Sequence, residues 1–217
     1  MIDTLFPTDR ALAFAATEAG GGAPKPPQPM QLRMRRPNLD DLPPLTVPSG
    51  YSLRTYRPGD EAAWAEIMNS EGGIGTGWTP DLVRARLIDQ PQFDPVGLFF
   101  ATCDAENGRP VASATAWRVP PEETRTGCLH MVAALPEHRG HGLGRMVNLA
   151  VLRYFRDRGF GDIVLSTDDF RVAAVRCYLS LGFVPVYRDD PASDHPTRWS
   201  AVFARVMALP LSRTPRG

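Results

Sequence analysis

The segment Val132-Ala-Ala-Leu-Pro-Glu-His-Arg-Gly-His-Gly-Leu-Gly144 joins an apolar strand to a turn that holds three glycines in five residues. A helix with an apolar stripe is predicted to follow at once, from Gly142 to about Arg158. Glycine lets the backbone approach a ligand closely, and the first turn of a helix offers unpaired N–H groups at the positive end of its dipole. The segment therefore predicts a phosphate cradle, and the competing interpretation is a plain strand-to-helix turn.

Two familiar phosphate-binding loops do not match this segment. A dinucleotide fingerprint spaces its glycines G-x-G-x-x-G, and here Arg145 stands where the third glycine should be. A nucleotide-hydrolase loop needs Gly-Lys-Ser/Thr, and the only lysine of the chain is Lys25. We therefore predict a phosphate-bearing ligand held in another way. Positive charge around the glycines comes from Arg139, Arg145, His138 and His141.

Strands and helices alternate on both sides of the cradle, which predicts a mixed α/β sheet with helices on its faces. Strands are expected at 51–56, 96–102, 110–118, 127–135, 163–165, 183–187 and 201–207. Helices are expected at 58–70, from the cap Thr79 to about 90, at 142–158, and from a cap at Asp168 or Asp169 to 181.

Proline is concentrated near the N-terminus: eight of the 22 prolines lie between Pro24 and Pro48. Proline removes amide donors, so this part is predicted to be poor in helix and strand. We expect residues 1–49 to be an extension with one short helix at about 9–19, either a free tail or an arm docked on the domain or on a second subunit. Residues 50–209 are then the folded domain and residues 210–217 a C-terminal tail.

The charges balance at 24 basic and 24 acidic residues, which argues against a role in holding nucleic acid or an anionic membrane. The sequence has no run of 18 apolar residues and no secretory signal, so we expect a cytoplasmic protein. Three widely spaced cysteines suit a reducing compartment: Cys103, Cys128 and Cys177. They lack zinc-finger spacing, and the pair His138 and His141 has no third ligand nearby in the sequence, so no metal site is expected.

Two motifs resemble those of the GNAT superfamily of acyl-CoA-dependent N-acetyltransferases. Arg139-x-x-Gly142-x-Gly144 is similar to its Q/R-x-x-G-x-G/A signature, and Ala174-x-x-x-Tyr178-x-x-x-Gly182-Phe183 is similar to its A-x-x-x-Y-x-x-x-G-F. The resemblance covers roughly residues 50 to 207. It implies a mixed, mostly antiparallel twisted sheet of about six to seven strands, flanked by about four helices.

The resemblance also implies acetyl-CoA as co-substrate and residues that bind it. The fourth strand of the family bulges and splays from the fifth, so its free backbone groups pair with the pantetheine arm. Those groups would belong to Val132, Ala133 and Ala134, across the gap from 163–167. Arg171 stands where the family often has asparagine, and it either reaches the cofactor phosphates or is solvated. The pyrophosphate would lie on the amides of Arg139, Gly140, His141, Gly142, Leu143 and Gly144, with Arg145 beside them.

Tyr178 matches the tyrosine that protonates the departing thiolate in the family, and the alternative is a tyrosine that only packs in the core. A backbone N–H near Val132 would polarise the thioester carbonyl. The glutamate that some members use as a base falls at Cys128, and a thiol is a poor base. His130 shares that strand face and has an ordinary pKa suited to accepting a proton, so it is the candidate base. Its rivals are ordered water, Asp168 and Asp169, which we expect to cap a helix, and Glu122 and Glu123, which we expect to be solvated.

The sequence thus predicts acetyl transfer from acetyl-CoA to a primary amine, by direct attack in a ternary complex. The acceptor would be a small molecule or a peptide, bound near the loop 72–78 with Trp78 and Trp64 as aromatic surface. A homodimer is among the expected assemblies. Two alternatives stay open: a non-catalytic CoA-binding module with the same fold, and an interaction protein whose proline-rich arm is the functional part.

Overall fold

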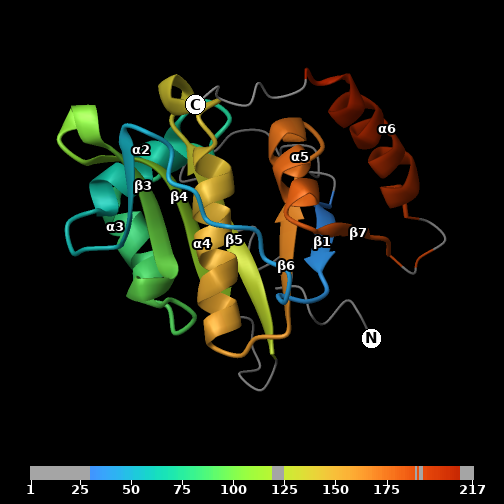
Figure 1. Cartoon of the computed structure of the whole chain (residues 1–217), viewed down its shortest axis with the longest axis horizontal. Coiled ribbons are helices and arrows are strands. Elements are labelled where there is room, and N and C mark those ends of the chain that lie inside the picture. The colour runs from blue at the N-terminus through green and yellow to red at the C-terminus, as the bar shows by residue number, and fades with distance from the viewer. Residues whose placement is uncertain (1–29, 119–124, 189, 191–192, 211–217) are drawn as a thin grey trace, which may run out of the picture.

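A computed structural model describes residues 30–118, 125–188, 190 and 193–210 (Figure 1). One sheet contains seven strands in the order β2-β3-β4-β5-β6-β1-β7. Every pairing is antiparallel except the parallel pair β5–β6. The expected mixed, mostly antiparallel sheet is confirmed. Its strands are β1 (Leu32–Arg36), β2 (Tyr51–Thr55), β3 (Leu98–Cys103), β4 (Arg109–Arg118), β5 (Thr126–Ala134), β6 (Asp162–Thr167) and β7 (Val184–Val186).

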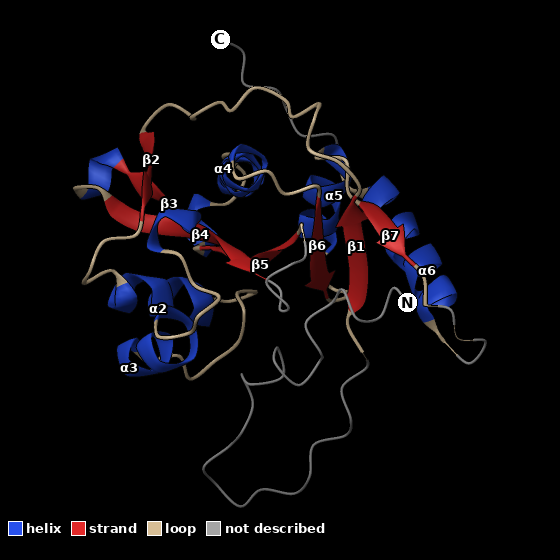
Figure 2. Ribbon diagram, turned by 90° about the horizontal axis from the view of Figure 1, so that it is seen from below, coloured by secondary structure: helices blue, strands red, loops and turns tan. Residues whose placement is uncertain are grey.

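Helices cover both faces of this sheet. Figure 2 shows α4 and α5 on one face and α2 and α3 on the other. Thr79 caps α3 as expected, because its Oγ1 accepts from the Leu82 amide at 3.2 Å. The α-helices are α2 (Glu61–Asn69), α3 (Pro80–Val83), which continues as the π-helical η3 (Arg84–Ile88), α4 (Leu143–Asp157), α5 (Val172–Ser180) and α6 (His195–Ala208). Short 3-10 turns are η4 (Pro95–Gly97), η5 (Asp104–Glu106) and η6 (Pro136–His138).

Strand β1 corrects the expected extension, because residues 30–49 belong to the fold. This strand lies between β6 and β7, and Met34 within it is fully buried. Its arginines have partners: Arg35 Nε donates to Asp162 Oδ2 at 2.6 Å. Paired charges can lie in an inner strand at modest cost, whereas unpaired ones cannot. The rest of the expected extension, residues 1–29, and the tail 211–217 lie outside the described residues.

The last element is a helix, α6, so the strand expected at 201–207 was wrong. Pro196 lies in its first turn, where backbone N–H groups have no partner within the helix, so the N–H that proline lacks costs no hydrogen bond. Its buried residues His195, Trp199 and Val202 recur at helical spacing and not at the alternation of a strand.

The cap expected before α5 is also absent from the structure. Arg171 is the residue that precedes the helix, and no side chain caps it. Asp168 Oδ2 instead accepts from Arg171 Nε at 2.8 Å, and Asp169 Oδ1 accepts from Arg198 Nη2 at 2.6 Å. The two aspartates are therefore occupied by ion pairs.

Candidate functional site

Strand β5 carries a bulge in its second half. Thr115 pairs with His130, and Ser113 pairs with Ala133, so β5 has one residue more than β4 between these pairs. Met131 at the bulge has φ of 49°, a left-handed conformation that is uncommon for a residue with a side chain. Ser113 Oγ donates to the Met131 carbonyl at 3.2 Å. A bulge re-aims the backbone that follows it, here at Val132.

The bulge lies where β5 separates from β6. The parallel pairing joins only 126–128 to 162–164, and beyond Cys128 the two strands diverge (Figure 1). Backbone groups on the facing edges of 130–134 and 165–167 are therefore available to an extended ligand between the strands. This is the bulged and splayed pair of strands that the family resemblance implies.

The three-glycine turn leads from the end of β5 into α4. Gly140 and Gly142 have φ of 84° and 82°, which a side chain would strain. A Cβ atom built on either of them, or on Gly144, meets no described atom within 4 Å. No side chain caps the first turn of this 15-residue helix. The turn is therefore an open cradle of backbone amides, which fits a phosphate group.

The arginines of this turn are engaged elsewhere. Arg139 Nε donates to the Ala134 carbonyl at 3.1 Å, and its Nη2 donates to the Glu71 carbonyl. The side chain thus connects the turn to the loop after α2. Arg145 Nη1 donates to Ser180 Oγ at 2.9 Å and borders a second cavity of about 500 Å³ at the end of α5.

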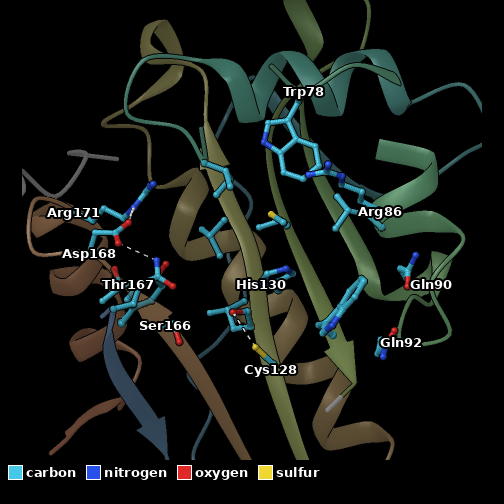
Figure 3. Close-up of a pocket in the computed structure, with 18 of the residues that line it drawn as sticks. Trp78, Arg86, Gln90, Gln92, Cys128, His130, Ser166, Thr167, Asp168 and Arg171 are labelled. Atoms are coloured by element: carbon cyan, nitrogen blue, oxygen red, sulfur yellow. Dashed lines mark hydrogen bonds and ion pairs between the residues drawn. The ribbon is translucent and has the colours of Figure 1, made fainter. Parts of the chain in front are cut away.

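A cavity of about 460 Å³ opens beside the separated strands (Figure 3). Figure 3 shows Trp78 and Arg86 on one side, Ser166 and Asp168 on the other, and His130 between them. Trp64, in contrast, is fully buried in the core against Phe93 and Phe100 and offers no acceptor surface. The predicted residues that this cavity brings together are Cys128, His130, Val132, Arg171 and Tyr178.

Tyr178 on α5 borders the cavity and is 6% exposed. Its burial raises the pKa of the phenol above the ordinary value, so the hydroxyl stays protonated at neutral pH. Burial likewise raises the pKa of the Cys128 thiol to about 12. Cys128 is therefore excluded as a base, in agreement with the sequence interpretation.

His130 differs from its expected state. Burial lowers the pKa of the imidazole from 6.5 to about 4. Its ring lies against Trp117, with 5.3 Å between the centroids. Among the described residues, no carboxylate offsets the cost of removing the charged imidazole from water. The histidine is therefore neutral at pH 7, which corrects the expectation of an imidazole that titrates near neutrality.

Arg171 lies at the loop 72–78, which we call the acceptor loop because the acceptor is expected near it, and not at the cradle. Its Nη2 donates to the Gly73 carbonyl at 2.6 Å, and its Nε donates to Asp168. Asp168 Oδ1 also accepts from Gln31 Nε2 at 2.9 Å. These contacts favour a positioning role for Arg171 over the expected one at the cofactor phosphates.

The cavity wall includes residues that the sequence interpretation missed. Gln31 lies in the part read as an extension, and Trp117 on β4 faces His130 from the next strand. For the remaining missed residues, the only local indication in the sequence was the helix expected after the loop 72–78. These further residues are Arg86, Gln90 and Gln92, whereas Ser166 lies within the range 163–167 that was expected across the gap.

The two histidines of the turn do not face the cradle as a pair. His138 is buried, and its Nδ1 lies 3.2 Å from the Tyr51 hydroxyl of β2. His141 Nδ1 lies 3.2 Å from the His138 carbonyl. The first of them faces Tyr51 of β2 and Cys103 of β3.

A bulged strand that leaves its parallel neighbour beside an open glycine cradle is the arrangement implied for an acyl-CoA-binding α/β domain. A family model described as "Acetyltransferase (GNAT) family" matches residues 63–183, more than half of the chain. The chain belongs to this family, which confirms the resemblance seen in the two motifs.

Curated relatives include proteins named mycothiol acetyltransferase. The one from Thermomonospora curvata is 39% identical over 160 residues, which cover 70% of this chain and 50% of the relative. The one from Nocardia farcinica is 37% identical over 155 residues, 68% of this chain and 50% of the relative. This chain therefore spans about half the length of these relatives.

Solved structures share the fold. A GCN5-related N-acetyltransferase from Sphaerobacter thermophilus superimposes with a TM-score of 0.60 at 24% identity, covering 73% of this chain and 50% of that one. The NatC complex bound to Gag peptide and CoA gives 0.54 at 17% identity, covering 64% of this chain and 87% of that one. In the described part of the chain, no helix has the length and apolar character needed to cross a membrane.

Proposed function

We propose that this chain transfers an acetyl group from acetyl-CoA to a primary amine. The observation that carries the proposal is the bulge at Met131. It turns the backbone of Val132 toward the cavity, at the point where β5 leaves β6 and Tyr178 borders the same space. The C-terminal end of this strand, just past the bulge, leads through η6 into the glycine cradle.

The cradle and the separated strand would hold the co-substrate from one end to the other. Amides of 139–144 suit the pyrophosphate, because the helix N-terminus is uncapped and the glycines leave open space. Free backbone groups of 132–134 suit the amides of the pantetheine arm. The thioester then lies near the Val132 N–H, which would polarise its carbonyl oxygen.

The reaction joins the amine nitrogen to the thioester carbon, and the carbon–sulfur bond breaks. Tyr178 donates a proton to the departing sulfur, since its raised pKa keeps the phenol protonated. His130 accepts a proton from the nitrogen. Because its pKa is about 4, it does so once the new bond has made the nitrogen far more acidic than a free ammonium.

The acceptor would lie in the cavity between the loop 72–78 and β6. The side-chain amides of Gln31, Gln90 and Gln92 border this space, and such groups donate and accept hydrogen bonds with a polar small molecule or a peptide. The acceptor of the mycothiol acetyltransferases is therefore the first to test. We place the enzyme in the cytoplasm, which suits its three unpaired cysteines.

The test measures free thiol released from acetyl-CoA, with and without a panel of amines. An enzyme releases thiol in proportion to an added amine and yields the N-acetyl product. A non-catalytic CoA-binding module would bind CoA in calorimetry and release no thiol with any amine, and this result would contradict the proposal.

A further inference from the structure

Three side chains of the kinds that bind metals converge away from the cavity. Cys103 is the last residue of β3, Glu106 lies in η5 and His138 lies in η6. A sulfur, a carboxylate oxygen and an imidazole nitrogen from these residues all lie within 4.8 Å of one another. Cys103 and His138 are buried, and the side chain of Glu106 is 36% exposed. The sulfur and imidazole ligands of the cluster are thus held inside the protein, and the carboxylate is the ligand that solvent can reach.

The imidazole nitrogen within the cluster has no hydrogen bond in the described part of the chain. This atom, His138 Nε2, is buried, and the whole residue is 6% exposed. It lies 3.0 Å from Glu106 Oε1, but this contact does not have the geometry of a hydrogen bond. When Nδ1 donates its hydrogen to Tyr51, Nε2 presents a lone pair to a carboxylate. A cation between the two atoms would relieve that repulsion.

We propose that Cys103, Glu106 and His138 form a binding site for a divalent transition-metal ion, and that the ion suited to it is zinc. Sulfur and nitrogen ligands disfavour magnesium and calcium, which take oxygen. Three protein ligands leave one position of a tetrahedral zinc ion for water. The sequence interpretation expected no metal, because His138 lies 32 positions after Glu106 and meets it and Cys103 only in the folded chain.

The geometry needs only a small closure. In a tetrahedral zinc site the ligand atoms lie roughly 3.3–3.6 Å apart. The Nε2–Oε1 separation of 3.0 Å is already close to this range. The remaining approach, on the order of 1 Å, is within the reach of the partly exposed Glu106 side chain and a rotation of Cys103 about its Cα–Cβ bond.

Neighbouring residues provide the outer contacts that metal ligands commonly have. Tyr51 Oη lies 3.2 Å from His138 Nδ1 and fixes the ring orientation. Arg109 Nη1 donates to Glu106 Oε2 at 2.9 Å and leaves Oε1 turned to the cluster. The guanidinium charge lowers the affinity for a cation, while its hydrogen bond holds the carboxylate in place.

The experiment uses the full chain after treatment with a chelator. Zinc is titrated by calorimetry, and cobalt is titrated by absorption spectroscopy. We expect one ion per chain, release of the thiol proton, and a thiolate-to-cobalt charge-transfer band. If the wild-type chain shows no saturable zinc binding, the proposal is overturned.

Variants then assign the ligands. Cys103→Ser should lose the charge-transfer band, and Glu106→Gln should weaken zinc binding by at least about tenfold. Cys177→Ser, which changes a cysteine outside the cluster, should bind as the wild type does. Glu106 is partly exposed, so its variant keeps the test decisive even if Cys103→Ser does not fold. Unchanged zinc affinity in Glu106→Gln, or an unchanged band in Cys103→Ser, would refute the site.

Discussion

Arg171 Nη2 donates to the carbonyl of Gly73 at 2.6 Å, which ties the start of α5 to a loop 98 residues earlier in the chain. Arg139 makes a similar bond to Glu71 from the cradle side. The loop that borders the acceptor cavity is thus held by one arginine from each half of the proposed site.

Arg171→Gln should loosen the acceptor loop and leave the cradle intact. A hydrogen bond from a charged group contributes about 1.5–3 kcal/mol, so we expect the KM for the amine to rise by roughly tenfold or more. The affinity for CoA should change little. Arg176→Gln, on the same helix but bonded to the Pro210 carbonyl, is the matched control. Equal effects of the two variants would show that Arg171 has no special link to the acceptor.

Gly144→Glu should abolish most CoA binding without harming the fold. The glycine is in the first turn of α4, its φ is not left-handed, and a Cβ there meets open space. A carboxylate in this turn favours the helix dipole but repels a phosphate. Loss of one charge-assisted contact corresponds to a roughly 10–100-fold weaker Kd in calorimetry. Gly144→Gln, of the same size and without charge, should lose less. If both variants bind CoA as tightly as the wild type, phosphate does not lie at this turn.

Tyr178→Phe should remove the proton donor and keep the ring in its packing against Phe183. We expect kcat to fall by roughly 10²–10⁴-fold, with the Kd for CoA nearly unchanged. Steady-state kinetics and calorimetry on the same preparation separate the two quantities. A kcat within about threefold of the wild type would make Tyr178 a core residue only.

The pH dependence of kcat/KM tests His130. Its lowered pKa of about 4 means that the imidazole is neutral and able to accept a proton at every pH above about 5. Activity that depends on the neutral ring should therefore be lost only as the pH falls through about 4. His130→Gln should cost at least about tenfold and abolish this limb, whereas Cys128→Ala should retain it. If His130→Gln keeps the wild-type pH profile, the proton of the amine nitrogen passes to water or stays with a group of the acceptor, and His130 is not the base.

Met34→Ala should destabilise the chain strongly, because β1 is an inner strand. Met34 is fully buried, and truncating such a side chain costs about 2–5 kcal/mol. Denaturant unfolding measures the difference. Val47→Ala, at a side chain that is 42% exposed, should stay within about 0.5 kcal/mol. A neutral Met34→Ala would restore the interpretation of residues 30–49 as a removable extension.

Local patterns were enough to predict the strand-to-helix glycine turn, the central strands and the position of Tyr178 on the helix α5; the proton-donor role of Tyr178 stays a prediction. The glycine turn and the two motifs are short in sequence, and each is visible without knowing the fold. Strand β1 was missed because the prolines between Pro24 and Pro48 predicted a segment without strands, and the partner of Arg35, Asp162, lies 127 residues away. The lowered pKa of His130 depends on burial beside Trp117, which no local pattern reveals.

Strand β7 was predicted at nearly its observed position, whereas α6 was not. The run 201–207 is apolar enough to pass for a strand when it is read alone. Its helical state depends on the first turn at Pro196 and on the burial of His195 and Trp199, which come earlier in the chain. The cavity wall is a similar case, since Gln31 lies just before β1 and Trp117 lies on β4, and only the sheet order brings them together.

The position of β1 between β6 and β7 also sets the order in which the molecule can fold as it is synthesised. Arg35 meets Asp162 only after 127 further residues have been made, which takes roughly 6–25 seconds at about 5–20 residues per second. During that interval the apolar side chains of β1 have no sheet to join. The half of the sheet from β2 to β5 can form first, and the nascent chain must keep its first strand from aggregating until its neighbours leave the ribosome.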